Sequence, residues 1–566
     1  MKRVIIGGLG AIAIATAPAT AQIDPMTQVP GAIQFRDVSP QDWAFEALSS
    51  LSDRYDCLVG YPDGTFRGNR PLTRYEFAAG LNACLNQLER AIGLGQVSPE
   101  DLETLERLMR EFEAELVALS ERVDSLEDRV GFLEDHQFST TTKLSSNVFL
   151  NLTEASPAGD IKVETNNINT PPPLNLRRAA RNSLTNQPVV SIAEEPSTTL
   201  SYLSWINFNT SFTGRDNLAI QLAAGTGNSP ANALASAGLY NTFGVPFTDQ
   251  SSLGTSDVVI RELFYTFPVG EQFRVTVGPR INWYRHFDGN RYTFFLTGAG
   301  SFNSSGGTLV NAIDRGSGAV VQWQFSDFAG LTVGYLGENT EFLPSPFFNT
   351  SSNPAKGLFG PTSTTTVQLS VNPINNVNFN AFYTYSKIDN NVPILDQNGN
   401  TTGFGVGGAT SEPFYGVADD GFGGTINDAI AHTFAINGSW AITPNIGLFG
   451  RYTYGITNID PVTVGRPDGE IRAQSLQLGV AFPDLGKEGA LGTVSYLLPF
   501  SILEGRNFLA AGGGNGGIQY EFEATYFYPL SRNIALVPAF YMIGNANNFS
   551  DNPNIYVFNL RTQFSF

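Results

Sequence analysis

From about residue 140 to the end of the chain, apolar and polar residues alternate along short segments. Between Val377 and Tyr385, for example, Phe379 and Tyr383 share one face, while Asn378 and Asn380 lie on the other. Because successive side chains of a β-strand point to opposite faces, this alternation predicts strands with one apolar and one polar face. The turn sequence at residues 372–376 precedes this strand, which predicts an antiparallel hairpin.

The same pattern repeats in other hairpins, and the connections between them differ greatly in length. Short turns are predicted at residues 326–330, 443–445 and 529–533. Long polar insertions lie at residues 225–256, 337–365 and 387–430. Alternation alone would also fit a soluble sandwich, but short turns that alternate with long insertions are typical of an outer-membrane barrel. At roughly 25 residues per strand and connection, residues 140–566 predict a transmembrane antiparallel β-barrel of about 16 strands.

The last segment, residues 555–566, alternates in the same way and ends in Phe566. Phe564 and Phe558 lie on one face, and Ser565 and Arg561 on the other. A final strand with a terminal Phe resembles the assembly signal of bacterial outer-membrane proteins. Phe566 is therefore expected to be recognised by the outer-membrane barrel assembly machinery.

Residues 99–137 follow a helical period instead. Apolar residues recur at spacings of three and four from Leu102 to Leu133, with Glu and Arg between them, and Ser98-Pro99 marks a helix start. So narrow a stripe over more than four heptads predicts a coiled coil through which the chain oligomerises. The alternative is one long helix docked on the barrel.

The first 34 residues predict export. Basic Lys2 and Arg3 precede an apolar run that ends near Ala21, which is typical of a signal peptide at residues 1–21. An uncleaved N-terminal anchor is the alternative. Residues 22–34 form a short linker. Cys57 and Cys84 are the two cysteines of this exported chain, so a disulfide between them is favoured over free thiols.

Residues 35–90 contain a run of motifs that resembles an S-layer homology (SLH) domain. The motifs are FRDV at 35–38, WA at 43–44, GYPDGTFR at 60–67 and PLTRYEFA at 71–78, with Tyr75 where the family has Ala. The resemblance implies a groove for cell-wall polysaccharide lined by Asp37, Trp43, Gly60 and Arg74. The planar fork of an Arg suits a sugar that bears a carboxylate. The alternative is that Trp43 packs in the core and Arg74 at a helix start.

Composition narrows the function further. The 566 residues include 12% aromatic and 15% charged residues, and the net charge is −19, which argues against nucleic acid as a partner. His136, His286 and His432 are the only histidines and lie far apart in the sequence. We therefore expect no metal site, no cofactor, no catalytic residues and no enzymatic activity.

The order signal peptide, SLH domain, coiled coil and barrel resembles the cyanobacterial SLH-containing porins, an "iron uptake porin" group related to the OprB carbohydrate porins. The resemblance implies a homotrimer in outer-membrane lipid, with the N-terminal domain in the periplasm on peptidoglycan-linked polysaccharide. It implies passive diffusion of small hydrophilic solutes and inorganic ions, with sugars and iron both candidates. The alternative is mainly a structural tether between membrane and wall.

Strand parity then predicts which charged residues line the pore. Arg274, Arg451, Glu521, Glu523 and Arg561 are expected to face inward. The insertion at about 284–317 could fold inward as a constriction that supplies Arg285 and Arg291. An ordinary external loop is the alternative reading of that insertion.

Overall fold

The computed structural model describes residues 43, 47, 50–51, 77–79, 81–82, 84–85, 98–117, 141–166, 178–226, 229–238, 258–297, 301–306, 309–310, 312–340, 350–360, 362–407 and 413–566. The chain divides into two compact units, Met1–Gln137 and Phe138–Phe566. Each unit has a hydrophobic core of its own. Among the described residues, no helix combines the length and the apolarity needed to cross a membrane.

The N-terminal unit contains helix α3 (Pro99–Glu111), which begins where the sequence predicts. The Ser98 side chain caps it by accepting a hydrogen bond from the Asp101 amide at 3.2 Å. One face of α3 is buried within the same unit, in a cluster made of Leu51, Phe77, Leu81, Cys84, Leu105, Leu108 and Phe112. Phe77 and Phe112 stack with ring centroids 4.4 Å apart.

This packing differs from the coiled coil predicted for residues 99–137. Helix α3 ends at Glu111, Leu108 is buried, and Met109, which the prediction places in the seam, is exposed. The start of the apolar stripe is therefore covered by its own unit, because other helical residues of that unit supply the apolar partners. Residues 118–137 lie outside the described residues. Cys84 is disulfide-bonded, and Cys57 lies outside the described residues.

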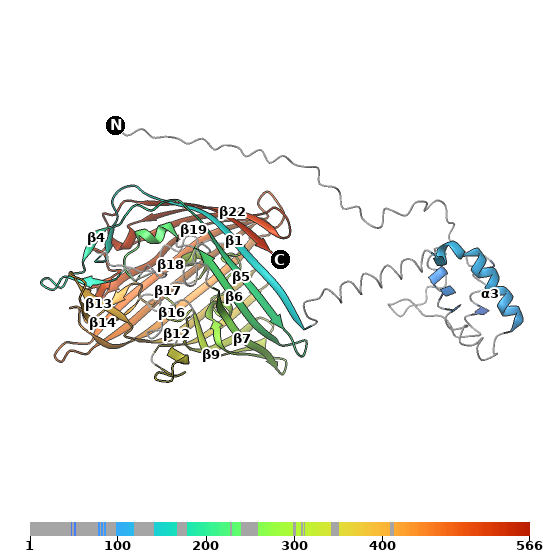
Figure 1. Ribbon diagram of the computed structural model, residues 1–566, viewed down its shortest axis with the longest axis horizontal. Coiled ribbons are helices and arrows are strands. Elements are labelled where there is room, and N and C mark those ends of the chain that lie inside the picture. The colour runs from blue at the N-terminus through green and yellow to red at the C-terminus, as the bar shows by residue number, and fades with distance from the viewer. Residues whose placement is uncertain are drawn as a thin grey trace, which may run out of the picture. The chain divides into compact units, whose positions relative to one another are not determined.

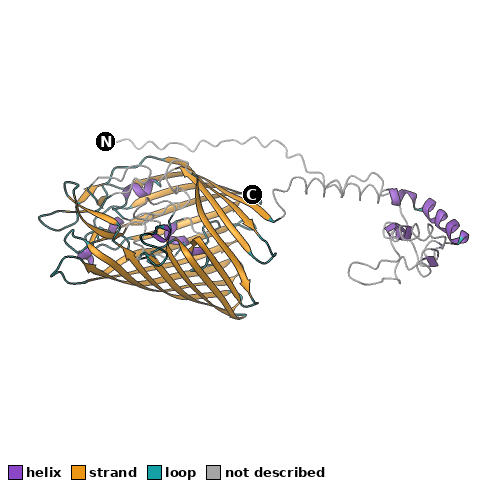
Figure 2. Ribbon diagram, turned by 60° about the horizontal axis from the view of Figure 1, so that its bottom comes forward, coloured by secondary structure: helices purple, strands orange, loops and turns teal. Residues whose placement is uncertain are grey.

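The second unit is a closed antiparallel barrel of sixteen strands, which confirms the predicted fold class (Figures 1 and 2). The barrel strands are β1 (Thr142–Pro157), β5 (Thr199–Thr210), β6 (Asn217–Thr226), β7 (Val259–Val269), β8 (Phe273–Asn282), β9 (Arg315–Ser326), β10 (Ala329–Glu338), β11 (Ser363–Ile374), β12 (Val377–Asp389), β16 (Ile426–Thr443), β17 (Ile446–Pro461), β18 (Gly469–Pro483), β19 (Leu491–Glu504), β21 (Tyr520–Pro529), β22 (Ile534–Gly544) and β23 (Ile555–Ser565). All are long enough to cross a bilayer at a tilt. Figure 2 shows that tilt clearly.

The barrel closes by pairing its first strand with its last. β1 pairs with β5 on one side and with β23 on the other, with Leu150 opposite Thr562 and Leu152 opposite Leu560. At the end of the chain, the Ser146 amide donates to the Phe566 carbonyl, and the Phe566 amide donates to the Ser146 carbonyl at 3.1 Å. No sheet edge is left open in the barrel, as a membrane requires.

The two faces of each strand differ as the alternation predicts. In β11, Val367 and Leu369 are exposed on the outside, while Thr366 and Gln368 are buried on the inside. An apolar outer face suits lipid, and a polar inner face suits a lumen.

The two rims of the barrel are unlike. Short turns join β5 to β6, β7 to β8, β9 to β10, β11 to β12, β16 to β17, β18 to β19, and β21 to β22; we call their end the short-turn rim. The other end, the long-loop rim, carries the long connections. Both β1 and the C-terminus begin or end at the short-turn rim.

The long loops contain small sheets that the sequence interpretation missed. Residues 387–430 are predicted as a polar insertion, but they form β13 (Val392–Asp396), β14 (Thr401–Gly407) and β15 (Val417–Ala418). These strands join β3 (Ala180–Arg181) and β20 (Leu509–Ala511) in a five-stranded sheet, and β2 (Lys162–Glu164) pairs with β4 (Val190–Ile192). The partners come from distant loops, so no local sequence pattern announces them.

Candidate functional site

The connection from β8 to β9, residues 283–314, lies inside the barrel, and we call it the inner loop. It starts with the 3₁₀ turn η4 (Trp283–Arg285), whose Trp283 is fully buried. The Trp283 indole Nε1 donates to Thr366 Oγ1 of β11 at 2.9 Å. Its ring lies 6.0 Å from that of Phe382 on β12. The loop therefore leaves the wall it comes from and packs against neighbouring strands of the inner face.

The middle of the inner loop is fixed by Asp288. Its carboxylate forms a buried ion pair with Arg451 of β17, with Nε and Oδ2 3.0 Å apart, and accepts a hydrogen bond from Asn437 of β16 at 2.6 Å. Its amide donates to Gln368 Oε1 of β11 at 2.8 Å. Asp288 adopts φ of 56°, a left-handed conformation that Asp tolerates better than most residues. One residue thus fastens the loop to three strands.

The far part of the inner loop reaches β21 and β23. Near the short helix α5 (Phe302–Ser305), the Ser301 hydroxyl donates to Glu523 at 2.6 Å and the Asn303 amide donates to Glu521 at 3.0 Å. Arg561 of β23 donates from Nη2 to the Phe295 carbonyl at 3.0 Å. The loop therefore extends from its own strands across the lumen to the opposite side of the wall.

Glycines on the inner face make room for aromatic residues of the loop. A Cβ at Gly334 would lie 2.9 Å from the Phe287 ring, and one at Gly447 would clash with the Tyr292 ring. Close approach of this kind is a use for glycine in a strand.

The structure divides the predicted pore-lining residues into two groups. Arg451, Glu521, Glu523 and Arg561 point inward, but they are buried beneath the inner loop and hold it. This differs from the expectation that they face a water-filled lumen. The reason is that the inner loop covers them, and parity alone gives no information on such a cover.

The second group keeps its charges more accessible. Arg285 is 46% exposed and pairs with Glu262 at 2.5 Å. Arg291 donates from Nη2 to the Asn375 carbonyl at the short-turn rim, at 3.0 Å. Arg274 is exposed in a cavity near the same rim. The insertion at 284–317 is therefore not an external loop in this structure, and it brings Arg285 and Arg291 inside the barrel.

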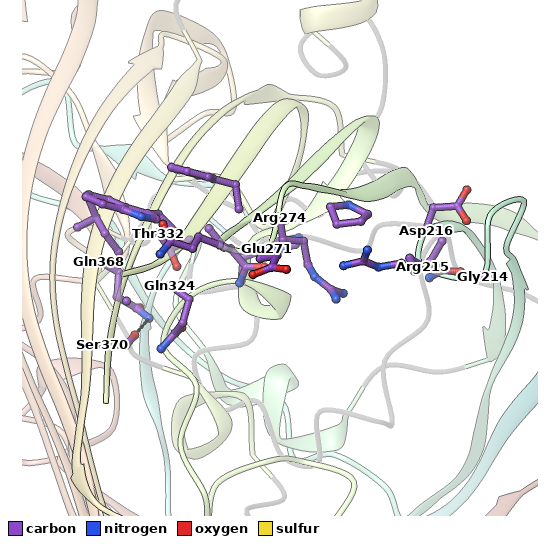
Figure 3. A pocket seen from close by; sticks show the side chains of 18 residues that line it. Gly214, Arg215, Asp216, Glu271, Arg274, Gln324, Thr332, Gln368 and Ser370 are labelled. Atoms are coloured by element: carbon purple, nitrogen blue, oxygen red, sulfur yellow. Dashed lines mark hydrogen bonds between the residues drawn. The ribbon is translucent and has the colours of Figure 1, made fainter. Parts of the chain in front are cut away.

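A polar cavity of about 640 Å³, which we call the vestibule, lies between the inner loop and the short-turn rim (Figure 3). Its walls are the β5–β6 and β7–β8 turns, the inner faces of β8 to β11 and His286 of the inner loop. The lining includes Arg215 and Glu271, which the sequence analysis did not select. Both lie in turns, where strand parity gives no direction. No group of side chains among the described residues is arranged to hold a metal ion.

In the N-terminal unit, the structure describes only one of the predicted polysaccharide-binding residues. Trp43 is half-buried against the core, and the guanidinium carbon of Arg107 lies 3.8 Å from the centroid of its ring. Asp37, Gly60 and Arg74 lie outside the described residues. These contacts favour the packing alternative for at least one face of Trp43.

Comparison with known proteins agrees with this architecture. The family described as "Carbohydrate-selective porin, OprB family" matches residues 99–566. The S-layer homology domain matches residues 34–78.

Several relatives match the sequence. An uncharacterized protein of Nostoc sp. (strain PCC 7120) is 31% identical over 95% of this chain and 86% of its own length. An uncharacterized protein of Synechocystis sp. (strain PCC 6803) is 30% identical over 96% of this chain and 92% of its own length. The outer membrane protein SlpA of Thermus thermophilus is 40% identical over 112 residues, 19% of this chain and 12% of SlpA.

Among solved structures, OprB of Pseudomonas putida covers 77% of this chain and 96% of its own, with a TM-score of 0.45 and 10% identity. The match to the family covers the whole barrel, and the fold is the one this family requires. The chain therefore belongs to the OprB family of carbohydrate-selective porins of the outer membrane, and it carries an SLH domain on the periplasmic side.

Proposed function

We propose that the chain forms a pore for passive diffusion of small hydrophilic solutes and inorganic ions across the outer membrane. The observation that carries the proposal is a closed barrel with an apolar outer face, a polar vestibule and an inner loop that narrows the lumen. In such pores, selectivity follows from the radius and the lining charges. We assign the lining role to Arg274, Arg285 and Arg291, whose charged groups are the more accessible ones.

Conductance in planar lipid bilayers tests this proposal. The purified full-length protein should give discrete channels, and its ion selectivity and its block by added sugars or iron salts would identify the preferred solutes. The family description favours sugars. Absence of channels from correctly folded protein would reject the diffusion function.

We also propose that the N-terminal unit holds the barrel to peptidoglycan-linked polysaccharide through Asp37, Trp43, Gly60 and Arg74. The SLH match supports this role, and an Arg suits an anionic sugar. The test is co-sedimentation of the protein with purified cell walls. Arg74→Gln should abolish binding, whereas Arg110→Gln, which removes an exposed charge on α3, should not.

We propose a homotrimer as the working assembly. The apolar stripe that continues from Leu116 to Leu133 supports association of several chains. Three SLH domains in one assembly would bind a wall more tightly than one through effective concentration. Sedimentation of the detergent-solubilised protein checks the number of chains.

The alternative is that the chain serves mainly as a tether between membrane and wall. Deleting residues 35–90 separates the two roles. A diffusion pore should retain solute flux after the deletion, whereas a tether should lose envelope integrity. Loss of integrity with no flux in the intact protein would favour the tether.

A further inference from the structure

Two arginine side chains in the vestibule have no acidic partner. Arg215, in the β5–β6 turn, and Arg274, on the inner face of β8, both line the cavity and both are exposed. Figure 3 shows both side chains extending into it. Neither side chain forms a hydrogen bond or ion pair with any residue that the structure describes. In contrast, Arg285 and Arg451 are paired with Glu262 and Asp288.

The carboxylate next to Arg215 is already occupied. Asp216 accepts hydrogen bonds from the Tyr265 hydroxyl at 2.7 Å and from the amide and hydroxyl of Thr213, both at 2.8 Å. Burial alone would raise its pKa, but these hydrogen bonds hold the pKa of Asp216 below its usual value. In Figure 3 its carboxylate is directed away from the cavity. Asp216 therefore shapes the turn rather than neutralising Arg215.

Glu271 is the other carboxylate of the lining, and it forms no ion pair with either arginine. The remaining polar lining residues are neutral. Gln322 and Thr332 have side chains with no printed partner among the described residues, so their donors are available to a solute. The vestibule thus presents two guanidinium groups and neutral donors, in a chain whose net charge is −19.

We infer that the vestibule is a weak binding site for the oxyanion group of a passing solute, namely a carboxylate, a phosphate or a sulfate. The guanidinium fork matches such a group in shape and can bond it through two parallel N–H donors. Two arginines from different turns would hold it from two directions. Weak binding is what a pore requires, because a solute that binds tightly does not leave. The inference rests on the proposed diffusion function and names the solutes it favours.

The experiment measures ion selectivity of the full-length protein in planar bilayers under a KCl gradient, with inorganic phosphate as the probe. The double variant Arg215→Gln/Arg274→Gln should lower the ratio of anion to cation permeability by about twofold or more, because two lining charges are lost. It should also lose the partial block of chloride current by phosphate. Glu271→Gln should change the permeability ratio in the opposite direction.

Arg532→Gln is the matched control, since Arg532 is an exposed cation in the β21–β22 turn of the same rim and does not line the vestibule. It should leave both measurements unchanged. An equal change in Arg532→Gln would assign the effect to rim charge in general and overturn the site.

Two further outcomes separate the inference from the function on which it rests. Channels with the same selectivity and phosphate block in wild type and double variant would overturn the site but leave the pore intact. No channels from wild type would reject the pore itself. Should the double variant not assemble, Arg215→Lys/Arg274→Lys decides. It should keep the permeability ratio but need a severalfold higher phosphate concentration for block, since Lys lacks the fork; unchanged block would overturn the proposed recognition.

Discussion

The Arg451 guanidinium on the barrel wall and the Asp288 carboxylate on the inner loop form an ion pair at 3.0 Å from which solvent is almost entirely excluded. Removing one member of such a pair leaves the other charge buried without compensation. Arg451→Ala should therefore destabilise the barrel by about 3 to 5 kcal/mol. It should also increase single-channel conductance, because the middle of the loop loses its anchor.

Urea unfolding and bilayer recordings check both effects. The double variant Arg451→Met/Asp288→Asn should be less destabilised than the sum of the two single variants, since no unpaired charge remains. Single variants with wild-type stability and wild-type conductance would contradict the anchoring role of the pair.

Gly447 gives a second way to displace the loop. A side chain at this position would meet the Tyr292 ring, so Gly447→Val should push the loop from β17 and cost about 1 to 3 kcal/mol. Gly450→Ala on the same strand is the control, because its Cβ would meet Leu478 of the outer face at 3.2 Å. Noisier or larger currents are expected from Gly447→Val alone. Identical recordings from both variants would show that the Tyr292 contact does not position the loop.

Glu164, in the loop between β1 and β5, should make the long-loop rim sensitive to pH. Burial raises the pKa of Glu164 from 4.5 to about 7, although the Gly512 and Gly514 amides donate to its carboxylate at 2.5 and 3.0 Å. The folded state then holds a proton that the unfolded state has released. This contribution to stability is full below pH 4.5 and is lost as the pH rises to about 7.

The loss amounts to about 3 kcal/mol of local stability. Hydrogen exchange of the Gly512 and Gly514 amides should accelerate across this range beyond the ordinary base-catalysed increase. Glu164→Gln should remove the extra acceleration. If the variant and the wild type respond to pH alike, Glu164 does not control the rim.

Phe566 permits a test of what the end of the chain contributes to assembly. Deleting it removes both backbone hydrogen bonds to Ser146 and the aromatic ring, whereas Phe566→Ala removes only the ring. If the ring is the assembly signal, both variants should reach the outer membrane severalfold less than wild type. Quantification of folded barrel in membrane fractions checks this. Normal insertion of Phe566→Ala would assign the role to strand closure instead.

The sequence predicted the barrel because each of its strands is a local pattern. Asn378 and Asn380 face inward, and Phe379 outward, as alternation requires. One residue on the same strand held further information: Phe382 lies on the polar face, and it packs on Trp283 of the inner loop. A large aromatic residue on an inward face indicates that something other than water fills that part of the lumen.

The candidate site was less accessible to sequence reasoning. Parity gave the inward direction of Arg451 and Glu523, but not their burial, because Asp288 and Ser301 reach them across the lumen. The β13–β15 segment was missed for a similar reason, since its strands are short and pair with β3 and β20 from other loops. Arg215 was missed because turns have no periodicity.

The inner loop also has a mechanical consequence. A hollow cylinder under sideways load yields first by flattening into an oval, which needs no bond to break. Here the contacts of the loop on β11, β17, β21 and β23 join opposite sides of the cylinder like an internal spoke. The width of the passage should therefore be insensitive to lateral tension in the surrounding bilayer, and osmotic swelling of the cell should change the flux of solutes little.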